Sequence, residues 1–386
     1  MIDNIYSAVP LPVSITSVDV LKDFLGMLQE VKEFDDINFV SDRNVVIKAS
    51  KKVYRIGSRK LKSSEVEFIA NYIGKGANVA SDVRGGGQLD ESFKFVYKDK
   101  KPYRFRVNIS ALQNTSTQGL KVNMRAISSD IPTLDYVGLS EDEYSLMMNG
   151  PGLVIISGET GSGKTTTVAG TIGHLIRNSH RTDDSRIISG YENPVEYLYQ
   201  PLVENQIDEH GCCSIEVYQH EIPIDLPSFS EGMRNAFRSN PDIIILGEAR
   251  DRVTIEASLQ AALSGHLVFI TTHAKGFLNT IARLITSFDE SQRDAARTDF
   301  STCIKMVISQ ELILHQDGRG IVPLREKMVF TEDLRRKFAK CETKDLTAAL
   351  ANAFELEGHS FLMDAKELRE SGQISDAQFQ HIAVQK

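Results

Sequence analysis

The chain contains Gly158-Glu159-Thr160-Gly161-Ser162-Gly163-Lys164-Thr165, which fits the pattern G-x-x-x-x-G-K-S/T at every position. The apolar run Leu153–Ile156 comes directly before it and predicts a β-strand. Apolar residues then recur at helical spacing in Val168, Ile172, Leu175 and Ile176. A strand, a glycine-rich loop and a helix in this order are the setting in which such a loop binds phosphate. The stretch therefore predicts a nucleotide-binding domain of the α/β class.

The residue types of this loop suit phosphate binding. Its glycines let the backbone bend and turn several N–H groups inward. Lys164 supplies a cation for the β- and γ-phosphates, and the Thr165 hydroxyl is a ligand for Mg²⁺. A glycine-rich turn that matches by chance is the alternative, and the strand and helix on either side disfavour it. We expect ATP and Mg²⁺ as ligands, with all of Gly158–Thr165 lining the nucleotide site.

Length and composition limit the class of protein. The chain has 386 residues, of which 41% are hydrophobic and 25% charged, as is typical of a globular protein of two or three domains. The formal net charge of −8 weighs against nucleic-acid binding, which favours a basic surface. No stretch approaches the roughly 20 apolar residues of a membrane span, and the N-terminus lacks a signal-peptide pattern. We therefore expect a cytoplasmic protein that does not itself span a membrane.

Residues 1–127 predict a smaller α+β domain. Apolar residues at helical spacing predict a helix over residues 17–33. The runs 93–97 and 103–109 predict a β-hairpin, because the second run alternates strictly between apolar and polar residues. A third alternating run covers residues 120–125.

The polar side of these predicted strands carries three arginines. Arg104 and Arg106 belong to the second run and Arg125 to the third. Since alternate residues of a strand point to the same face, we expect the three to share one solvent-facing sheet surface. A solvated basic face without a ligand is the simpler explanation from spacing alone.

A linker is expected over residues 128–137, where Pro132 restricts the backbone of its own residue and the one before it. Residues 138–343 then predict the nucleotide-binding domain, in which apolar runs alternate with helical segments. The predicted strands are Leu153–Ile156, Arg186–Ile188, Ile243–Leu246 and Leu267–Thr271. This alternation predicts a mostly parallel sheet.

The C-terminal part is predicted to be mainly helical. One exception is a hairpin, in which residues 312–315 and 321–329 flank the turn pair Asp317-Gly318. Residues 344–386 predict a helical segment of two amphipathic helices.

A candidate catalytic acid follows the apolar run Ile243–Leu246. Glu248 is placed there to orient an attacking water or to hold Mg²⁺ through a bridging water. An ordinary surface glutamate after a buried strand is the alternative, and the phosphate loop upstream disfavours it. Asp251 is expected to cap the helix that begins near Arg252.

Two further polar groups follow apolar runs. Glu192 begins the stretch Glu192-Asn193-Pro194-Val195-Glu196-Tyr197, and His273 ends the stretch that starts at Leu267. The carboxyl ends of strands in an open α/β sheet face the ligand crevice, so both are candidates for the site. By spacing alone, a solvated turn and a structural histidine are the simpler interpretations.

The order of these motifs resembles that of the secretion NTPase superfamily, the hexameric motors of type II and type IV secretion and of type IV pili. In that family an acidic "aspartate box", a Walker B segment and a "histidine box" follow the phosphate loop. Here the three boxes correspond to Glu192–Tyr197, Ile243–Asp251 and Gly265–His273. The stretch Glu221–Ala236 is similar to the branch of the DotB and TraJ ATPases, found in type IVB secretion and plasmid conjugation.

The resemblance implies a fold and a function. It implies a RecA-like P-loop ATPase domain preceded by a smaller α+β (PAS-like) domain. It also implies a homohexameric ATP hydrolase that powers a type IV (IVB-like) secretion or conjugative transfer apparatus through ATP-driven domain closure. Such a ring would lie at the cytoplasmic face of the inner membrane and work with inner-membrane components of the machine.

The resemblance also implies roles for single residues. Glu192 and Glu248 would be the catalytic carboxylates, Glu248 also acting near the metal, and His273 would contact the γ-phosphate. The arginines at 104, 106 and 125 would reach the nucleotide from the N-terminal domain. Asn193 stands where the family usually has aspartate, so a second acidic group in that box is in doubt.

Three alternative functions stay open. The first is a pilus-retraction motor on the same fold. The second is a RecA-like nucleic-acid motor, which the acidic net charge disfavours. The third is a nucleotide-gated structural ring with little turnover, which the intact Lys164, Thr165 and Glu248 disfavour.

Overall fold

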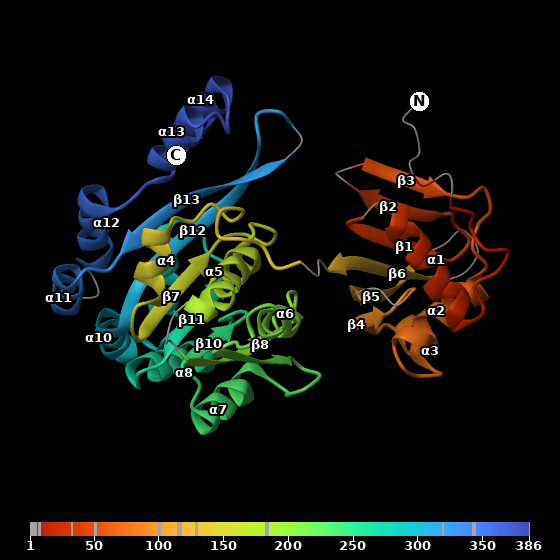
Figure 1. Ribbon diagram of the computed structural model, residues 1–386, viewed down its shortest axis with the longest axis horizontal. Coiled ribbons are helices and arrows are strands. Elements are labelled where there is room, and N and C mark those ends of the chain that lie inside the picture. The colour runs from red at the N-terminus through yellow and green to blue at the C-terminus, as the bar shows by residue number, and fades with distance from the viewer. Residues whose placement is uncertain are drawn as a thin grey trace. The chain divides into compact units, whose positions relative to one another are not determined.

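The structure is a computed structural model that describes residues 6, 9–31, 34–49, 52–98, 102–113, 118–127, 130–181, 185–318, 320–341 and 345–385. The chain divides into two compact units, Met1–Asp130 and Ile131–Lys386 (Figure 1). Residues 128 and 129 of the expected linker lie outside the described residues.

The first unit is built on a six-stranded antiparallel sheet in the order β3-β2-β1-β6-β5-β4. Its strands are β1 (Asp36–Val40), β2 (Val45–Ala49), β3 (Lys52–Ile56), β4 (Gln88–Phe95), β5 (Tyr103–Gln113) and β6 (Gln118–Ile127). Three helices pack with the sheet around one apolar core: α1 (Val18–Val31), α2 (Ser63–Ile73) and α3 (Val79–Arg84). The expected N-terminal helix and the expected hairpin are α1 and the β4–β5 pair, so both predictions are confirmed.

The second unit is built on a seven-stranded sheet in the order β13-β12-β7-β11-β10-β8-β9. Its strands are β7 (Gly152–Ser157), β8 (Arg186–Glu192), β9 (Ile215–Glu221), β10 (Ile243–Leu246), β11 (Leu267–Thr272), β12 (Ile304–Leu314) and β13 (Ile321–Val329). All neighbours pair in parallel except β12 and β13, which form the expected antiparallel hairpin. The first strand of this hairpin begins at Ile304, not at residue 312 as expected, and it also pairs in parallel with β7. The prediction of a mostly parallel sheet is confirmed.

Helices cover both faces of this sheet, because successive residues of the buried strands point to opposite sides. In β10, for example, Ile244 and Leu246 belong to one core, and Ile243 and Ile245 to the other. On the first side lie α7 (Phe229–Ser239), α8 (Arg252–Leu263), α9 (Phe277–Thr286), α10 (Arg293–Cys303), α11 (Glu332–Lys340) and α12 (Leu346–Glu357). On the second side lie α4 (Glu141–Met148), α5 (Lys164–Asn178) and α6 (Gln200–His210) (Figure 1).

Two expectations about the borders of the second unit differ from the structure. The C-terminal segment contains three helices, not two, since α12 is followed by α13 (Phe361–Glu370) and α14 (Asp376–Gln385). A backbone break at Gly358 and a turn at Gly372 separate them. Residues 131–139, most of which were expected to be linker, pack against α5 and contribute Leu134, Val137 and Leu139 to its core.

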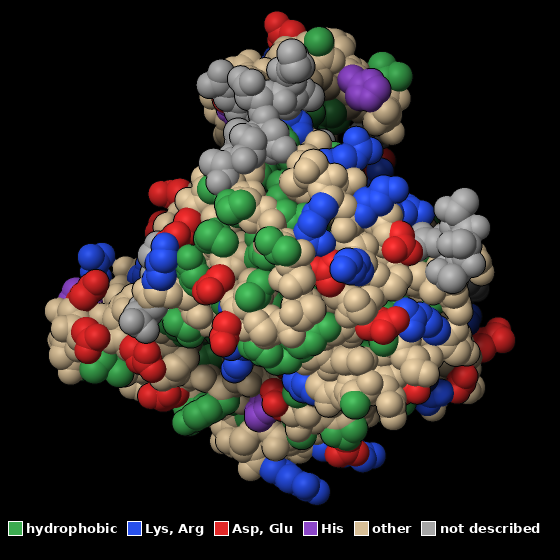
Figure 2. Space-filling view, turned by 90° about the vertical axis from the view of Figure 1, so that its right-hand side faces the viewer, with side chains coloured by type: hydrophobic (Ala, Val, Ile, Leu, Met, Phe, Trp, Pro, Cys, Tyr) green, Lys and Arg blue, Asp and Glu red, His purple; other side chains and the backbone are tan. Residues whose placement is uncertain are grey.

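The described surface is mixed in charge on the face that Figure 2 shows. Lys and Arg side chains are interspersed there with Asp and Glu side chains, and apolar side chains lie between them, several of them close together near the centre of the view. Among the described residues, no helix is both long enough and apolar enough to cross a membrane.

Candidate functional site

The phosphate loop joins β7 to α5 and turns at three glycines. The backbone angle φ is +147° at Gly158, +81° at Gly161 and +83° at Gly163, values that favour glycine. A Cβ atom added to Gly158 would lie 2.3 Å from the carbonyl oxygen of Gln310. The loop therefore runs directly against β12, and its path depends on the absence of a side chain at Gly158.

Lys164 places a cation inside this loop. Its Nζ donates to the carbonyl oxygens of Gly158 at 2.8 Å and Glu159 at 3.0 Å. Burial lowers the pKa of the ammonium group, and the carboxylates of Glu248 and Glu196 act in the opposite direction. Both carboxylates are thus close enough to act on this charge. The loop holds its positive charge where negatively charged phosphates would enter.

Hydroxyl groups and backbone donors complete the loop. The buried Oγ atom of Ser162 has no hydrogen-bond partner among the described residues. Gly163 is the N-cap of α5, so the first backbone N–H groups of the helix and its partial positive charge face the loop. Thr165 lies half-buried in the first turn of α5. The hydroxyl of Thr165 and the carboxylate of Glu248 are oxygen donors of the kind that Mg²⁺ prefers, so the residues present fit this ion.

Four adjacent parallel strands bring the candidate residues to one edge of the sheet. In the order β7-β11-β10-β8, the phosphate loop follows β7, His273 follows β11, Glu248 follows β10, and Glu192 ends β8. The alignment continues past the strands, because the N–H of Gly247 donates to the carbonyl oxygen of Tyr191 at 2.8 Å. All four features therefore gather at the carboxyl edge, where ligands bind in open α/β sheets.

Glu248 is held by two neighbours. His273 Nε2 lies 3.1 Å from Oε1 of the carboxylate, and Arg250 Nε lies 2.7 Å from Oε2. Arg283 in turn donates to the carbonyl oxygen of His273 at 2.6 Å. The side chain of Glu248 is 18% exposed, so solvent reaches the carboxylate. An oriented carboxylate with access to water is suited to act as a general base.

Glu192 is more deeply buried, at 4% exposure. Gln219 holds it through its Nε2 group, which donates to Glu192 Oε1 at 3.0 Å and to the carbonyl oxygen of Tyr197 at 2.7 Å. A Cβ atom on Gly247 would lie 3.0 Å from the Cα atom of Glu192, so glycine lets the two strand ends approach closely. This carboxylate has a fixed position beside the Walker B segment.

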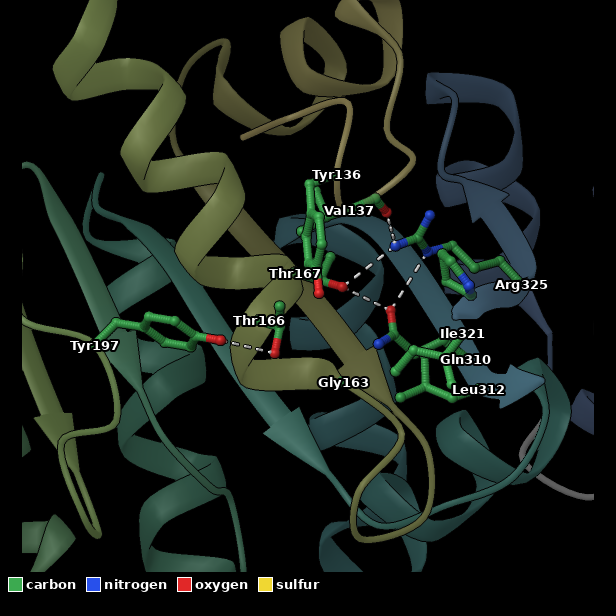
Figure 3. Close-up of a pocket in the computed structure, with 11 residues that line it drawn as sticks. Tyr136, Val137, Gly163, Thr166, Thr167, Tyr197, Gln310, Leu312, Ile321 and Arg325 are labelled. Carbon is green, nitrogen blue, oxygen red and sulfur yellow. Dashed lines mark hydrogen bonds between the residues drawn. The ribbon is translucent and has the colours of Figure 1, made fainter. Parts of the chain in front are cut away.

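A cavity of about 130 Å³ lies beside the first turn of α5. Its lining combines polar groups with apolar and aromatic ones: Tyr136, Val137, Gly163, Thr166, Thr167, Tyr197, Gln310, Leu312, Ile321, Pro323 and Arg325 (Figure 3). The hydroxyls of Thr166 and Tyr197 are 3.2 Å apart and link α5 to the end of the acidic box. The cavity therefore borders both the phosphate loop, at Gly163, and the first turn of α5.

The family described as type II/IV secretion system protein matches residues 89–345, more than half of the chain. The chain belongs to this family.

Relatives in the type II/IV secretion family act in secretion and in type IV pili. The pilus retraction ATPase PilT of Pseudomonas aeruginosa is 32% identical over 272 residues, which cover 70% of this chain and 73% of that protein. The crystal structure of the Legionella pneumophila ATPase DotB matches with a TM-score of 0.83 at 32% identity over 100% of both chains. A structure of PilT with bound ADP matches in fold, with a TM-score of 0.75 at 24% identity over 96% of this chain and 97% of that one. The chain is therefore a secretion or pilus ATPase by family.

The three arginines of this type II/IV secretion family member lie in the first unit. Arg106 of β5 lies directly opposite Arg125 of β6, and Arg125 Nε lies 3.0 Å from Asp36 Oδ1. Arg106 and Arg125 are exposed, but Arg104 is only 8% exposed, so the expectation of three solvent-facing arginines is wrong for Arg104. The strand register still places all three on one face of the sheet.

Several residues that hold the site were not assigned a role from the sequence. Gln219 holds Glu192, Arg250 holds Glu248, and Gln310 donates to the carbonyl oxygen of Ser162 at 2.6 Å. Gln219 and Gln310 come from strands far from their partners in sequence, so no local spacing reveals them. Arg250 lies only two residues after Glu248, and this short separation is the one feature of the sequence that could have indicated their contact.

Proposed function

We propose that this chain hydrolyses ATP at the carboxyl edge of the seven-stranded sheet. The main support is the position of Lys164 inside a glycine-shaped loop, with the His273-oriented carboxylate of Glu248 at a neighbouring strand end. A cation, a helix N-terminus and a fixed general base are the parts that phosphoryl transfer to water requires.

Each residue of the site has a defined task in this proposal. Lys164 leaves the loop carbonyls and binds the β- and γ-phosphates. Thr165 and Glu248 would hold Mg²⁺, which would neutralise charge on the phosphates. The Glu248 carboxylate orients the attacking water, and the imidazole of His273 keeps the carboxylate in place. Glu192, fixed by Gln219, adds a second carboxylate next to the water.

The cavity beside α5 extends this site. We assign it to the nucleoside part of ATP, because it begins at Gly163 and Thr166, next to the phosphate loop. Tyr136 and Leu312 offer an aromatic and an apolar surface on which a base can stack.

The machine served by this ATPase is proposed to be a type IV (IVB-like) secretion or conjugative transfer apparatus. The similarity to DotB over the full length of both chains supports this assignment. The protein would act as a homohexamer at the cytoplasmic face of the inner membrane and bind inner-membrane components of the apparatus. A type IV pilus retraction motor is the second candidate, supported by 32% identity to PilT. Deleting the gene and measuring conjugation, secretion and twitching motility in one strain separates the two.

The assignment of the nucleotide site is tested with two variants. Glu248→Gln should bind ATP with near wild-type affinity but turn it over at least about a hundredfold more slowly, because the amide is no base. Lys164→Ala should lose affinity for ATP. A Lys164→Ala protein that hydrolyses ATP at the wild-type rate would rule out this site. Turnover at the wild-type rate by Glu248→Gln would be compatible with nucleotide binding at this site but would show that Glu248 is not the catalytic base.

A further inference from the structure

Arg325 of β13 is a buried cation, 2% exposed, that the mechanism above does not use. Its guanidinium donates to the carbonyl oxygens of Val137 and of Gly138 (2.7 Å), to the hydroxyl of Thr167 (3.3 Å) and to Gln310 Oε1 (3.4 Å). None of these acceptors is a carboxylate. Burial is the larger effect on this group and lowers the pKa of the guanidinium to about 10, although the carboxylates of Asp364 and Glu143 favour the charged form. Hydrogen bonds from one planar guanidinium to several acceptors offset part of the cost of this burial.

On one side the guanidinium of Arg325 is connected to the phosphate loop. Thr167 Oγ1 donates to Gln310 Oε1 at 2.9 Å, and Gln310 Nε2 donates to the carbonyl oxygen of Ser162 at 2.6 Å. Figure 3 shows the guanidinium between Val137, Thr167 and Gln310. Three polar side chains therefore connect the interior of β13 to the backbone of the loop, and the loop backbone cannot shift at Ser162 without moving or breaking this chain of hydrogen bonds.

On the other side the guanidinium of Arg325 holds residues 131–139. This segment runs along α5, the helix that begins at the phosphate loop. At the far end of α5, Arg177 donates to the carbonyl oxygens of Ile131 at 2.6 Å and Pro132 at 3.0 Å. The segment is thus held by one arginine at each end, and only Arg325 is also hydrogen-bonded to the groups that contact the loop.

We propose that Arg325 is a positioning residue that couples the phosphate loop to residues 131–139, through which the chain continues to the first unit. The coupling rests on the proposed nucleotide binding. When the loop adjusts to the phosphates, Gln310 and Thr167 follow it, and Arg325 transfers the displacement to the carbonyl groups of Val137 and Gly138. A contiguous set of rigid hydrogen bonds is the physical means by which such a shift travels through a packed interior.

Arg297 offers a matched control in the same unit. It is buried to a similar degree, at 8% exposure, and donates to the carbonyl oxygens of Phe338 at 2.9 Å and Ala339 at 2.5 Å. These acceptors lie at the end of α11, and no hydrogen bond among the described residues joins them to the phosphate loop. Arg297→Lys therefore reproduces the loss of a buried guanidinium without touching the coupling.

The test measures backbone amide exchange in the full chain, with Mg²⁺ and a non-hydrolysable ATP analogue as the probe. In the wild type the analogue should slow exchange both in the loop and in residues 131–139. Arg325→Lys, which lacks the planar guanidinium, and Thr167→Val, which keeps the shape of the side chain, should retain the response of the loop. In residues 131–139, however, the analogue should slow amide exchange about tenfold less in these variants than in the wild type. A factor of this size corresponds to one lost hydrogen bond to a charged group. Arg297→Lys should keep both responses.

Turnover gives a second readout. Arg325→Lys should lower kcat by about tenfold when the enzyme is saturated with ATP. Because Arg325 also lines the cavity assigned to the nucleoside, a change in KM reports on nucleotide contact, and the fall in kcat at saturation reports on the coupling. A wild-type response of residues 131–139 in Arg325→Lys and Thr167→Val would overturn the proposal, and so would equal losses in Arg297→Lys. If Arg325→Lys does not fold, Thr167→Val decides the question. Absence of protection at the loop in the wild type would reject nucleotide binding itself, and the coupling with it.

Discussion

At the scale of single residues, Gly158 sets the path of the phosphate loop. We predict that Gly158→Ala lowers ATP affinity strongly and the free energy of unfolding by about 2 kcal/mol or more, because φ is +147° there and the new Cβ would meet the carbonyl oxygen of Gln310. Titration with a fluorescent ATP analogue and urea unfolding measure the two effects.

Gly161→Ala is the control for this prediction. Gly161 also has a positive φ, +81°, but nothing lies within 4 Å of an added Cβ. Gly161→Ala should lower the free energy of unfolding only by the backbone strain of alanine at a positive φ, about 1 kcal/mol. Equal losses in the two variants would mean that the contact with Gln310 does not shape the loop.

Lys305 gives a prediction about pH. This lysine is 7% exposed, and its Nζ donates to the carbonyl oxygen of Gly150 at 2.9 Å. Burial, assisted by the charges of Arg335 and Arg186, lowers its pKa from 10.5 to about 8. Below pH 8 the folded state holds a charged group in a buried place. Between about pH 8 and 10.5 the folded state releases a proton that the unfolded chain keeps, so stability due to this group rises with pH.

The comparison that checks this prediction is with Lys305→Met, which cannot titrate. Between pH 7.5 and 10, the free energy of unfolding of the wild type should rise by about 2 kcal/mol relative to this variant, since one pKa unit corresponds to about 1.4 kcal/mol. Urea unfolding at both values of pH measures the difference. Parallel pH profiles would contradict the assigned shift.

Residues with local motifs were predictable, and residues with distant partners were not. The phosphate loop and the N-cap Asp251, which accepts from the N–H of Thr254 at 2.9 Å, follow from spacing along the chain. Arg325 was not predicted, because its acceptors on α5 and on residues 131–139 are more than 150 residues away in sequence. A single sequence without its fold does not reveal such contacts.

At the scale of elements, the packing of residues 131–139 on α5 depends on the absence of a side chain at Gly173. We predict that Gly173→Ala lowers the melting temperature, although alanine normally stabilises a helix interior by about 1 kcal/mol relative to glycine. The reason is that the new Cβ would lie 2.4 Å from Ile131 Cγ2 and 3.0 Å from the guanidinium of Arg177. Thermal unfolding of the wild type and the variant measures the effect.

Ile131→Ala provides the matching partner variant, because it removes the atom that Gly173→Ala would meet. The double variant should be more stable than the sum of the two single effects predicts, with a coupling of about 1 kcal/mol. Additive effects would show that the segment does not contact α5 at Gly173.

The elements that the sequence predicted share a strong period or a clear turn. The central strands β7, β10 and β11 are largely apolar runs between helices, and their burial on both faces explains why they stand out. Strands β1, β2 and β3 were missed, because charged or polar side chains interrupt their apolar residues. The third C-terminal helix was missed because apolar spacing alone does not locate the breaks at Gly358 and Gly372.

At the scale of the whole molecule, the phosphate loop and its carboxylates lie in one compact unit and the arginine face in the other. Arg106 and Arg125 lie directly opposite each other in β5 and β6, and like charges in that position repel. Among the ion pairs of the described residues, Arg125 is paired with Asp36 at 3.0 Å. Two facing arginines suit the binding of an anion, and the expectation from the sequence, which the structure does not test, is that ATP-driven domain closure brings the phosphates to them.

The last prediction tests this closure with Arg106→Gln. The variant should keep or slightly gain stability, since it removes a repulsion, but its ATP turnover should fall by about a thousandfold, the scale of an arginine that stabilises the transition state. Arg55→Gln makes the same charge change on β3 of the same sheet and should leave turnover unchanged. Light scattering must first find assemblies of about six times 43.0 kDa for both variants, so that a lost ring is not mistaken for a lost arginine.

Mixed rings then show which subunit supplies the arginine. Closure within one chain requires an intact Arg106 and an intact Lys164 in the same protomer. A mixture of Arg106→Gln and Lys164→Ala protomers contains no such chain, so its turnover should stay as low as that of the variants alone. Restored turnover would show that Arg106 acts on the loop of a neighbouring subunit, and unchanged turnover in Arg106→Gln alone would remove this arginine from the site.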